Sequence, residues 1–161
     1  MKKLLDAYYR LLQILLTLLM AVLIIPVTMQ ILSRYTGLIP RYIWTEEIAR
    51  FCFVWIIMLG AMIAVRDGTH FDVDVLPQFK SPKTEAAVRI FVHTAMLLMA
   101  IIFIWYGYAF AKFGAVQTSE IAGLPMLTIF IAWPLTGVTC LVFLGEKLIK
   151  DFNLLRAKVS V

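Results

Sequence analysis

The sequence predicts an all-α integral membrane protein with four transmembrane helices, because its composition is strongly apolar and the apolar residues fall into four long runs. Of its 161 residues 62% are hydrophobic and 16% are charged, and the mean hydropathy is +0.90. Soluble domains average about 45–50% apolar and about 25% charged residues. The runs cover about residues 11–33, 46–66, 90–111 and 121–145, and a helix needs ~20 such residues to cross a bilayer. We expect a single four-helix transmembrane domain over residues 1–161.

The first run, residues 11–33, contains no charged residue. It is too long for the core of a signal peptide, and no small-residue cleavage site follows it. We therefore expect it to remain attached as the first transmembrane helix. Pro26 is expected to bend this helix in its second half. The connection that follows is short and polar and contains Gly37 and Pro40.

The second run depends on a charged turn at its start. The uncharged part, residues 51–65, covers only about 22 Å as a helix, so the preceding turn must continue the helix for it to span. Thr45 followed by two acids is typical of a helix start. Glu46 and Glu47 lie four and three residues before Arg50, so both acids can reach this base on one helix face. We expect a charged cluster at one membrane boundary.

The rest of the chain contains a long polar loop and two further spans. The loop covers residues 66–89, and its part 71–79 mixes apolar and acidic residues. We expect 71–79 to form a short interfacial segment on the membrane surface. The fourth span contains Pro125 and Pro134, and a basic, amphipathic tail follows it.

The distribution of Lys and Arg predicts the orientation in the membrane. Four spans place both termini on one side, together with the loop between the second and third spans. That side carries eleven basic residues: Lys2, Lys3, Arg10, Arg66, Lys80, Lys83, Arg89, Lys147, Lys150, Arg156 and Lys158. The opposite side carries four: Arg34, Arg41, Arg50 and Lys112. Because the basic side of a membrane protein faces the cytoplasm, we expect both termini and this loop to be cytoplasmic.

The chain lacks the residues expected of a carrier or an enzyme. Carriers hold ionisable or unwound sites near mid-membrane, yet the first and fourth spans have no ionisable residue and the third has only His93, near its cytoplasmic end. His70, Asp72 and Asp74 would share one side of an extended strand, but loop polarity and helix capping explain them better than a metal site. The net charge of +5 comes with no basic run interleaved with aromatics, so we expect no nucleic-acid binding.

The two cysteines, Cys52 and Cys140, are expected to pack as free thiols. They lie near opposite ends of their spans, at depths that differ by roughly 20 Å. A disulfide needs Cα atoms within about 7 Å. Small residues in the second and third spans allow close helix contact, either within the chain or with a partner: Gly60, Ala61, Ala64, Gly107, Ala109 and Ala111.

One set of residues resembles a known family. The pattern Trp44-x-Glu46-Glu47-x-x-Arg50, then Trp55, Gly60-Ala61, Arg66, His70 and Asp74 is similar to the small membrane subunit of tripartite ATP-independent periplasmic (TRAP) transporters. The four spans, the chain length and the expected cytoplasmic termini also match this subunit.

The resemblance implies a non-catalytic scaffold in the bacterial inner membrane. Its partners would be a large multi-span subunit and a periplasmic substrate-binding protein, in contact with membrane lipids. Such transporters take up small organic acids, of the sialic acid or C4-dicarboxylate type, on a sodium gradient. Substrate and sodium sites would lie on the large subunit, so this chain is expected to hold no cofactor or metal. The residues expected at a partner interface or in structural roles are Trp44, Glu46, Glu47, Arg50, Trp55, Gly60, Ala61, Ala64, Arg66 and His70.

Two alternative functions remain open at this point. A homo-oligomeric channel or exporter would need a polar stripe, for which the first span offers Gln13, Thr17, Thr28 and Gln30. A haem-b membrane anchor would need histidines on facing helices, and the chain contains only two histidines.

Overall fold

The computed structural model describes residues 2–36, 40, 42–68, 82–121 and 123–159. Within these ranges the chain forms helices α1 (Lys2–Tyr35), α2 (Ile43–Asp67), α3 (Pro82–Gly114), α4 (Leu127–Phe130) and α5 (Ala132–Val159). Four segments are long and apolar enough to cross a membrane: Lys3–Tyr35, Ile43–Asp67, Phe91–Gly114 and Leu127–Lys147. The prediction of an all-helical protein with four such helices is confirmed. The expected interfacial segment 71–79 lies outside the described residues.

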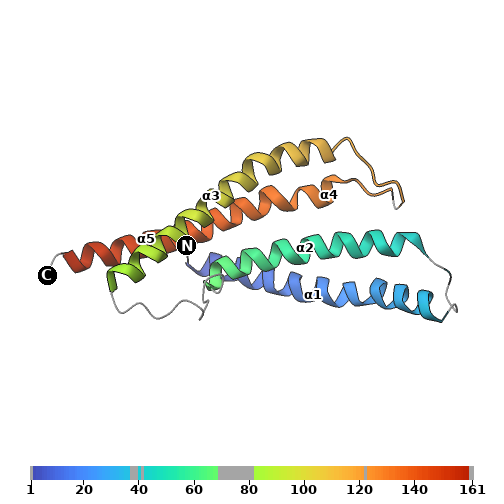
Figure 1. The fold of residues 1–161 in the computed structure, drawn as a ribbon, viewed down its shortest axis with the longest axis horizontal. Helices are drawn as coiled ribbons and strands as arrows, with labels where there is room; N and C mark the ends of the chain where they lie inside the picture. The colour runs from blue at the N-terminus through green and yellow to red at the C-terminus, as the bar shows by residue number, and fades with distance from the viewer. Residues whose placement is uncertain (1, 37–39, 41, 69–81, 122, 160–161) are drawn as a thin grey trace.

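The long helices lie side by side in the order α1, α2, α5, α3, and α4 continues the line of α5 (Figure 1). Helix α2 packs between α1 and α5, and α3 packs against the other side of α5. Helices α1 and α3 therefore form the two flanks of a layer. Near one end α1 also reaches α5, where the hydroxyls of Tyr8 and Thr139 lie 2.9 Å apart.

Helix α2 begins and ends differently from the expected 46–66 span. It starts at Ile43 after Tyr42, which makes no side-chain capping bond. Thr45 is not the cap, since its hydroxyl lies inside the first turn and donates to the Tyr42 carbonyl over 2.7 Å. At the other end Gly68 adopts a left-handed φ of 79° and its N–H donates to the Ala64 carbonyl. Glycine reaches this conformation without steric cost, so the helix stops there.

The fourth span begins at Leu127, six residues later than the expected Ile121. Before it, Thr118 and Pro125 form an isolated antiparallel bridge, and the Met126 N–H donates to the Gln117 carbonyl over 3.0 Å. Gly123 has a left-handed φ of 64°, which a right-handed helix does not allow. A turn rather than a helix therefore precedes Leu127, and the Ser119 N–H donates to the Leu124 carbonyl over 2.8 Å within it.

Pro134 explains why the fourth span divides into α4 and α5. Proline has no N–H, so the Phe130 carbonyl receives no bond from it. The break falls at Ile131, while the Leu135 N–H still donates to the Ile131 carbonyl over 3.2 Å. Ile131 itself keeps right-handed helical angles, φ −66° and ψ −20°, so α5 continues the course of α4.

Helices α3 and α5 approach each other closely at two glycines. A Cβ on Gly107 would lie 2.7 Å from the Pro134 nitrogen, and a Cβ on Gly137 would lie 2.8 Å from the Ala100 carbonyl oxygen. Only a missing side chain permits this approach. Of the two roles left open for Gly107, packing within the chain is the one observed.

The buried core lies where α1, α2 and α5 meet. Its residues are Leu12, Leu59, Met62, Val65 and Phe143, with Trp55 and Cys140 among those packed against it. Cys52 and Cys140 are both free thiols. This core sits close to one end of the layer, next to the charged residues that close that end.

Candidate functional site

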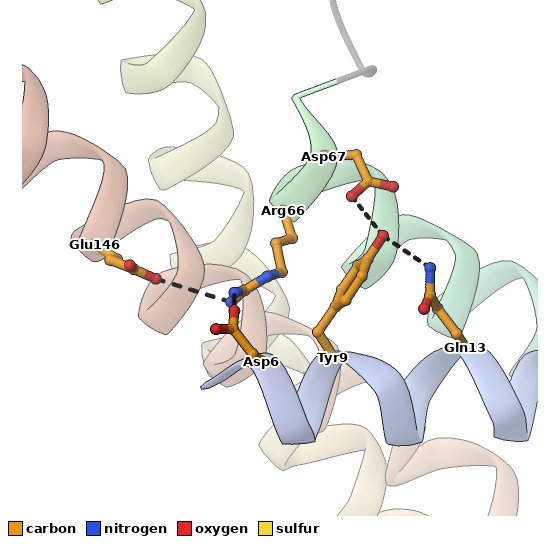
Figure 2. A network of polar contacts seen from close by, with 6 residues as sticks. All are labelled: Asp6, Tyr9, Gln13, Arg66, Asp67 and Glu146. Atoms are coloured by element: carbon orange, nitrogen blue, oxygen red, sulfur yellow. Dashed lines mark hydrogen bonds and ion pairs between the residues drawn. The ribbon is translucent and has the colours of Figure 1, made fainter. Parts of the chain in front are cut away.

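Arg66, in the last turn of α2, joins three helices at one end of the layer (Figure 2). Its Nη2 forms an ion pair with Asp6 of α1, and its Nη1 lies 3.8 Å from Oε2 of Glu146 in α5. The guanidinium also lies over the rings of Tyr9, at 5.2 Å, and Phe143, at 5.0 Å. A planar, permanently charged group suits this combination of two carboxylates and two ring faces.

Hydrogen bonds extend this arrangement along α1. The Tyr9 hydroxyl donates to Oδ1 of Asp67 over 2.6 Å, and Nε2 of Gln13 donates to the Tyr9 oxygen over 2.9 Å. We call Asp6, Tyr9, Gln13, Arg66, Asp67 and Glu146 the Arg66 cluster (Figure 2). Nearby, Nζ of Lys147 donates to the Val65 carbonyl over 2.8 Å.

The Arg66 cluster combines a shielded part and an open part. The side chains of Arg66 and Glu146 are 19% and 22% exposed, whereas that of Asp6 is 63% exposed. Solvent screens the contact of Arg66 with Asp6 more than its 3.8 Å contact with Glu146. Every acid of the cluster has a donor or a cation facing it, so the arrangement is suited to holding helices together.

The opposite end of the layer carries the charges predicted from the second span. Arg50 and Glu46 form an ion pair of 3.4 Å, one helical turn apart. Glu47 instead accepts a hydrogen bond from the Ser119 hydroxyl, which belongs to the loop between α3 and α4. Consecutive helical residues point about 100° apart, so the two acids serve different neighbours. The expected three-residue cluster is thus divided between the helix surface and a contact within the chain.

The two tryptophans of the motif differ in role. Nε1 of Trp55 donates to the Thr128 carbonyl over 2.9 Å, which connects α2 to α4. Trp44 is 42% exposed, and its ring lies 6.0 Å from that of Tyr42. Trp55 is therefore a structural residue of the chain, while Trp44 remains on the surface at the start of α2.

Gly60 does not bring α2 close to another described helix. A Cβ built on Gly60 meets no atom within 4 Å, in contrast to Gly107. Ala61 and Ala64 are half-buried. His70 of the predicted set lies outside the described residues, as do Asp72 and Asp74. In the described part of the chain no group of three or more His, Cys, Asp or Glu could hold a metal ion.

Both polar sites therefore lie at helix ends. The model of one protein family matches residues 23–154 of this chain, and this match decides what kind of protein it is. The family is described as tripartite ATP-independent periplasmic transporters, DctQ component. The chain belongs to the DctQ family. It is a component of a transporter rather than an enzyme, and a multi-pass protein of the inner membrane. The resemblance inferred from the helix-two motif is confirmed.

Curated relatives agree with membership of the DctQ family. The sialic acid TRAP transporter small permease protein SiaQ of Vibrio cholerae is 27% identical over 143 residues, which cover 89% of this chain and 80% of SiaQ. The C4-dicarboxylate TRAP transporter small permease protein DctQ of Rhodobacter capsulatus is 29% identical over 116 residues, 70% of this chain and 51% of that protein. The sialic acid TRAP transporter permease protein SiaT of Haemophilus influenzae is 30% identical over 109 residues, or 68% of this chain. The match spans only 18% of SiaT.

Some residues of the Arg66 cluster, and the partner of Glu47, were not predicted from the sequence. Asp6, Tyr9 and Glu146 complete the Arg66 cluster, and Ser119 binds Glu47. A signal did exist for the two acids: Asp6 and Glu146 are acidic residues at the otherwise basic ends of the first and fourth spans, on the same side as Arg66. No local pattern singles out Ser119, which pairs with a residue 72 positions earlier.

Proposed function

We propose that this chain is the non-catalytic scaffold subunit of a sodium-coupled transporter that takes up small organic acids. The observation that carries the proposal is the placement of charge. In the described spans the charged side chains lie near helix ends, where Arg66 and Glu47 hold helices and loops together. Among the described residues, the middle of the layer holds no Asp, Glu, Lys, Arg or His that could bind a substrate or a coupling ion.

A larger partner subunit would carry the transport chemistry. SiaT is a permease in which this chain matches only a fifth of the length, so most of that permease is a second part that this chain does not contain. We propose that a separate large multi-span subunit supplies that part here, with the substrate and sodium sites, and that a periplasmic binding protein delivers the substrate. The names of SiaQ and DctQ support sialic acid or a C4-dicarboxylate as the substrate class.

The orientation belongs to the same proposal. The end with the Arg66 cluster would face the cytoplasm, because eleven of fifteen Lys and Arg residues lie on that side in the sequence. The end with Glu46 and Arg50 would then face the periplasm. The turn at residues 115–126, which Ser119 holds against α2, would lie on that side as a firm surface for the binding protein.

Reconstitution in liposomes tests the proposal. The chain is purified alone and together with its co-expressed large subunit, and uptake of labelled sialic acid or succinate is measured with and without binding protein and a sodium gradient. Sodium-dependent uptake that needs the chain, the large subunit and the binding protein together is the expected result. Uptake or ion conductance by the chain alone would instead support the homo-oligomeric channel and overturn the scaffold.

A further inference from the structure

A cavity of about 460 Å³ lies between the end of α1 and the start of α2. These two helix ends lie at the end of the layer opposite the Arg66 cluster (Figure 1). The described residues that line the cavity belong to the last two turns of α1 and to the segment that leads into α2 and forms its first turn. The Arg66 cluster takes no part in this cavity, which therefore needs an explanation of its own.

Two polar side chains of α1 that line the cavity have buried atoms without partners. Nε2 of Gln30 and Oγ of Ser33 are buried, and within the described part of the chain neither makes a hydrogen bond. The two residues are three positions apart, so they lie on the same side of the helix. Leaving a buried donor unpaired is costly, and the Gln30 nitrogen can only donate. The partner that this side of α1 lacks is therefore a hydrogen-bond acceptor.

Arg34 adds a positive charge to the same lining, one helical turn after Gln30. Its side chain is exposed, and it takes part in none of the ion pairs found among the described residues. An amide N–H, a hydroxyl and a guanidinium at neighbouring positions of one helix form a donor set for an oxyanion. Because the planar guanidinium matches the geometry of phosphate as well as that of carboxylate, the acceptor is a negatively charged group of this kind.

The surroundings of the cavity place it at the level of lipid headgroups. Tyr35 and Tyr42 line it and are 82% and 46% exposed, and exposed tyrosines are typical of the boundary between membrane and water. Ile31 also lines it and is 53% exposed, and Ile24, two turns deeper on the same side of α1, is 64% exposed. A phospholipid could thus place its phosphate in the cavity and its acyl chains against α1.

Glu46 contributes a negative charge to the lining from the first turn of α2. Its Oε1 lies 3.4 Å from Nη2 of Arg50, and a carboxylate can accept further hydrogen bonds at its other oxygen. A headgroup with both a phosphate and an ammonium would meet Arg34 and Glu46 with opposite charges. A headgroup with a net negative charge would be repelled by Glu46.

We propose that the cavity between α1 and α2 is a binding site for a phospholipid whose headgroup carries a phosphate and an ammonium. The phosphate accepts hydrogen bonds from Gln30, Ser33 and Arg34, the ammonium faces Glu46, and the acyl chains run along Ile31 and the deeper turns of α1. The lipid joins the two helix ends that form the cavity. The binding itself is independent of the proposed function, and only its assignment to the periplasmic leaflet follows from the proposed orientation.

Native mass spectrometry of the full chain in detergent, titrated with dioleoylphosphatidylethanolamine, measures the binding. Arg34→Ala and Gln30→Leu should each weaken it by about tenfold, because each removes a donor to the phosphate. Lys112→Ala is the matched control, since Lys112 is an exposed basic residue in the last turn of α3 at the same end of the layer, and it should bind the lipid as the wild type does. Wild-type affinity in both cavity variants, or an equal loss in Lys112→Ala, would overturn the proposal.

A comparison of ligands on the wild-type chain needs no mutation. The same lipid should bind about tenfold more tightly than dioleoylglycerol, which has no phosphate, and more tightly than dioleoylphosphatidylglycerol, which has no ammonium. Glu46→Gln should abolish the second preference, because it removes the charge that distinguishes the two headgroups. Equal binding of dioleoylglycerol would mean that acyl chains alone are held and would contradict the inference.

A competition experiment separates a membrane lipid from a free phosphate ester. Phosphoethanolamine has the same headgroup without acyl chains, so it should displace the lipid from the wild-type chain only at concentrations about a hundredfold higher or more, since it lacks the apolar contact with α1. Displacement by phosphoethanolamine at concentrations equal to those of the lipid would assign the cavity to a free phosphate ester and overturn the lipid site.

Discussion

Arg66 shows how one side chain can hold several membrane helices at a boundary. Its guanidinium meets Asp6 on α1 and Glu146 on α5 and lies over Tyr9 and Phe143. A lysine would keep the charge but lose the planar fork and the stacking. The position at the end of α2 matters too, because water and headgroups there reduce the cost of gathering charges that mid-membrane would impose.

Replacement of Arg66 should therefore destabilise the chain in graded steps. We expect Arg66→Ala to cost about 1–3 kcal/mol, since it removes the guanidinium that faces the shielded Glu146, while the more exposed Asp6 loses little. Arg66→Lys should cost roughly half as much. Unfolding of the purified chain in detergent measures both, with Lys112→Ala, an exposed residue at the other end of the layer, as the control. A loss for Lys112→Ala as large as that for Arg66→Ala would contradict this role.

Sequence patterns located the charged sites only in part. The spacing of Glu46 and Arg50 was enough to predict their ion pair, because residues four apart in a helix are neighbours. The partners of Arg66 and Glu47 lie 60 and 72 positions away along the chain. Hydropathy gives such residues a depth in the membrane but does not say which helices stand next to each other, so these contacts required the structure.

At the scale of elements, glycines allow α3 and α5 to approach each other closely. The same residue type has opposite uses in this chain: Gly137 lets backbones approach, and Gly60 faces open space. Hydropathy placed all four spans, yet it placed the start of the fourth at Ile121. The turn around Gly123 depends on a left-handed backbone, and an apolar flanking sequence hides such a turn from any hydropathy pattern.

The crowded position of Gly137 and the open position of Gly145 predict different effects of an added methyl group on stability. Gly137→Ala should destabilise the chain by about 1–3 kcal/mol, because the new Cβ would lie 2.8 Å from the rigid carbonyl oxygen of Ala100 and the helices must separate. Gly145→Ala should be neutral or slightly stabilising, since alanine favours helix and the site is open. Thermal unfolding in detergent compares them. Equal midpoints for the two variants would show that the α3–α5 contact tolerates a methyl group.

At the scale of the molecule, the layer consists of two helix pairs, α1 with α2 and α3 with α5, joined along α2 and α5 (Figure 1). This seam is held near one end by Arg66 and Glu146 and further along by Trp55, which donates to the Thr128 carbonyl of α4. The proposed scaffold role would require such fixed spacing, because bending between α2 and α5 would absorb the motion of the partner that a scaffold has to resist.

The ion pair of Arg66 and the hydrogen bond of Trp55 should together fix the spacing between α2 and α5. Arg66 and Trp55 lie about 16 Å apart along α2, so the two contacts hold α2 and α5 together at separate points. Trp55→Phe keeps most of the ring but removes the hydrogen bond, and Arg66→Ala removes the ion pair. Spin labels on α2 and α5 should report a narrow distance distribution in each single variant and a broad one in the double variant, because either tie alone still fixes the spacing of the two pairs. A narrow distribution in the double variant would mean that apolar packing around Met62 and Phe143 suffices to hold the layer together.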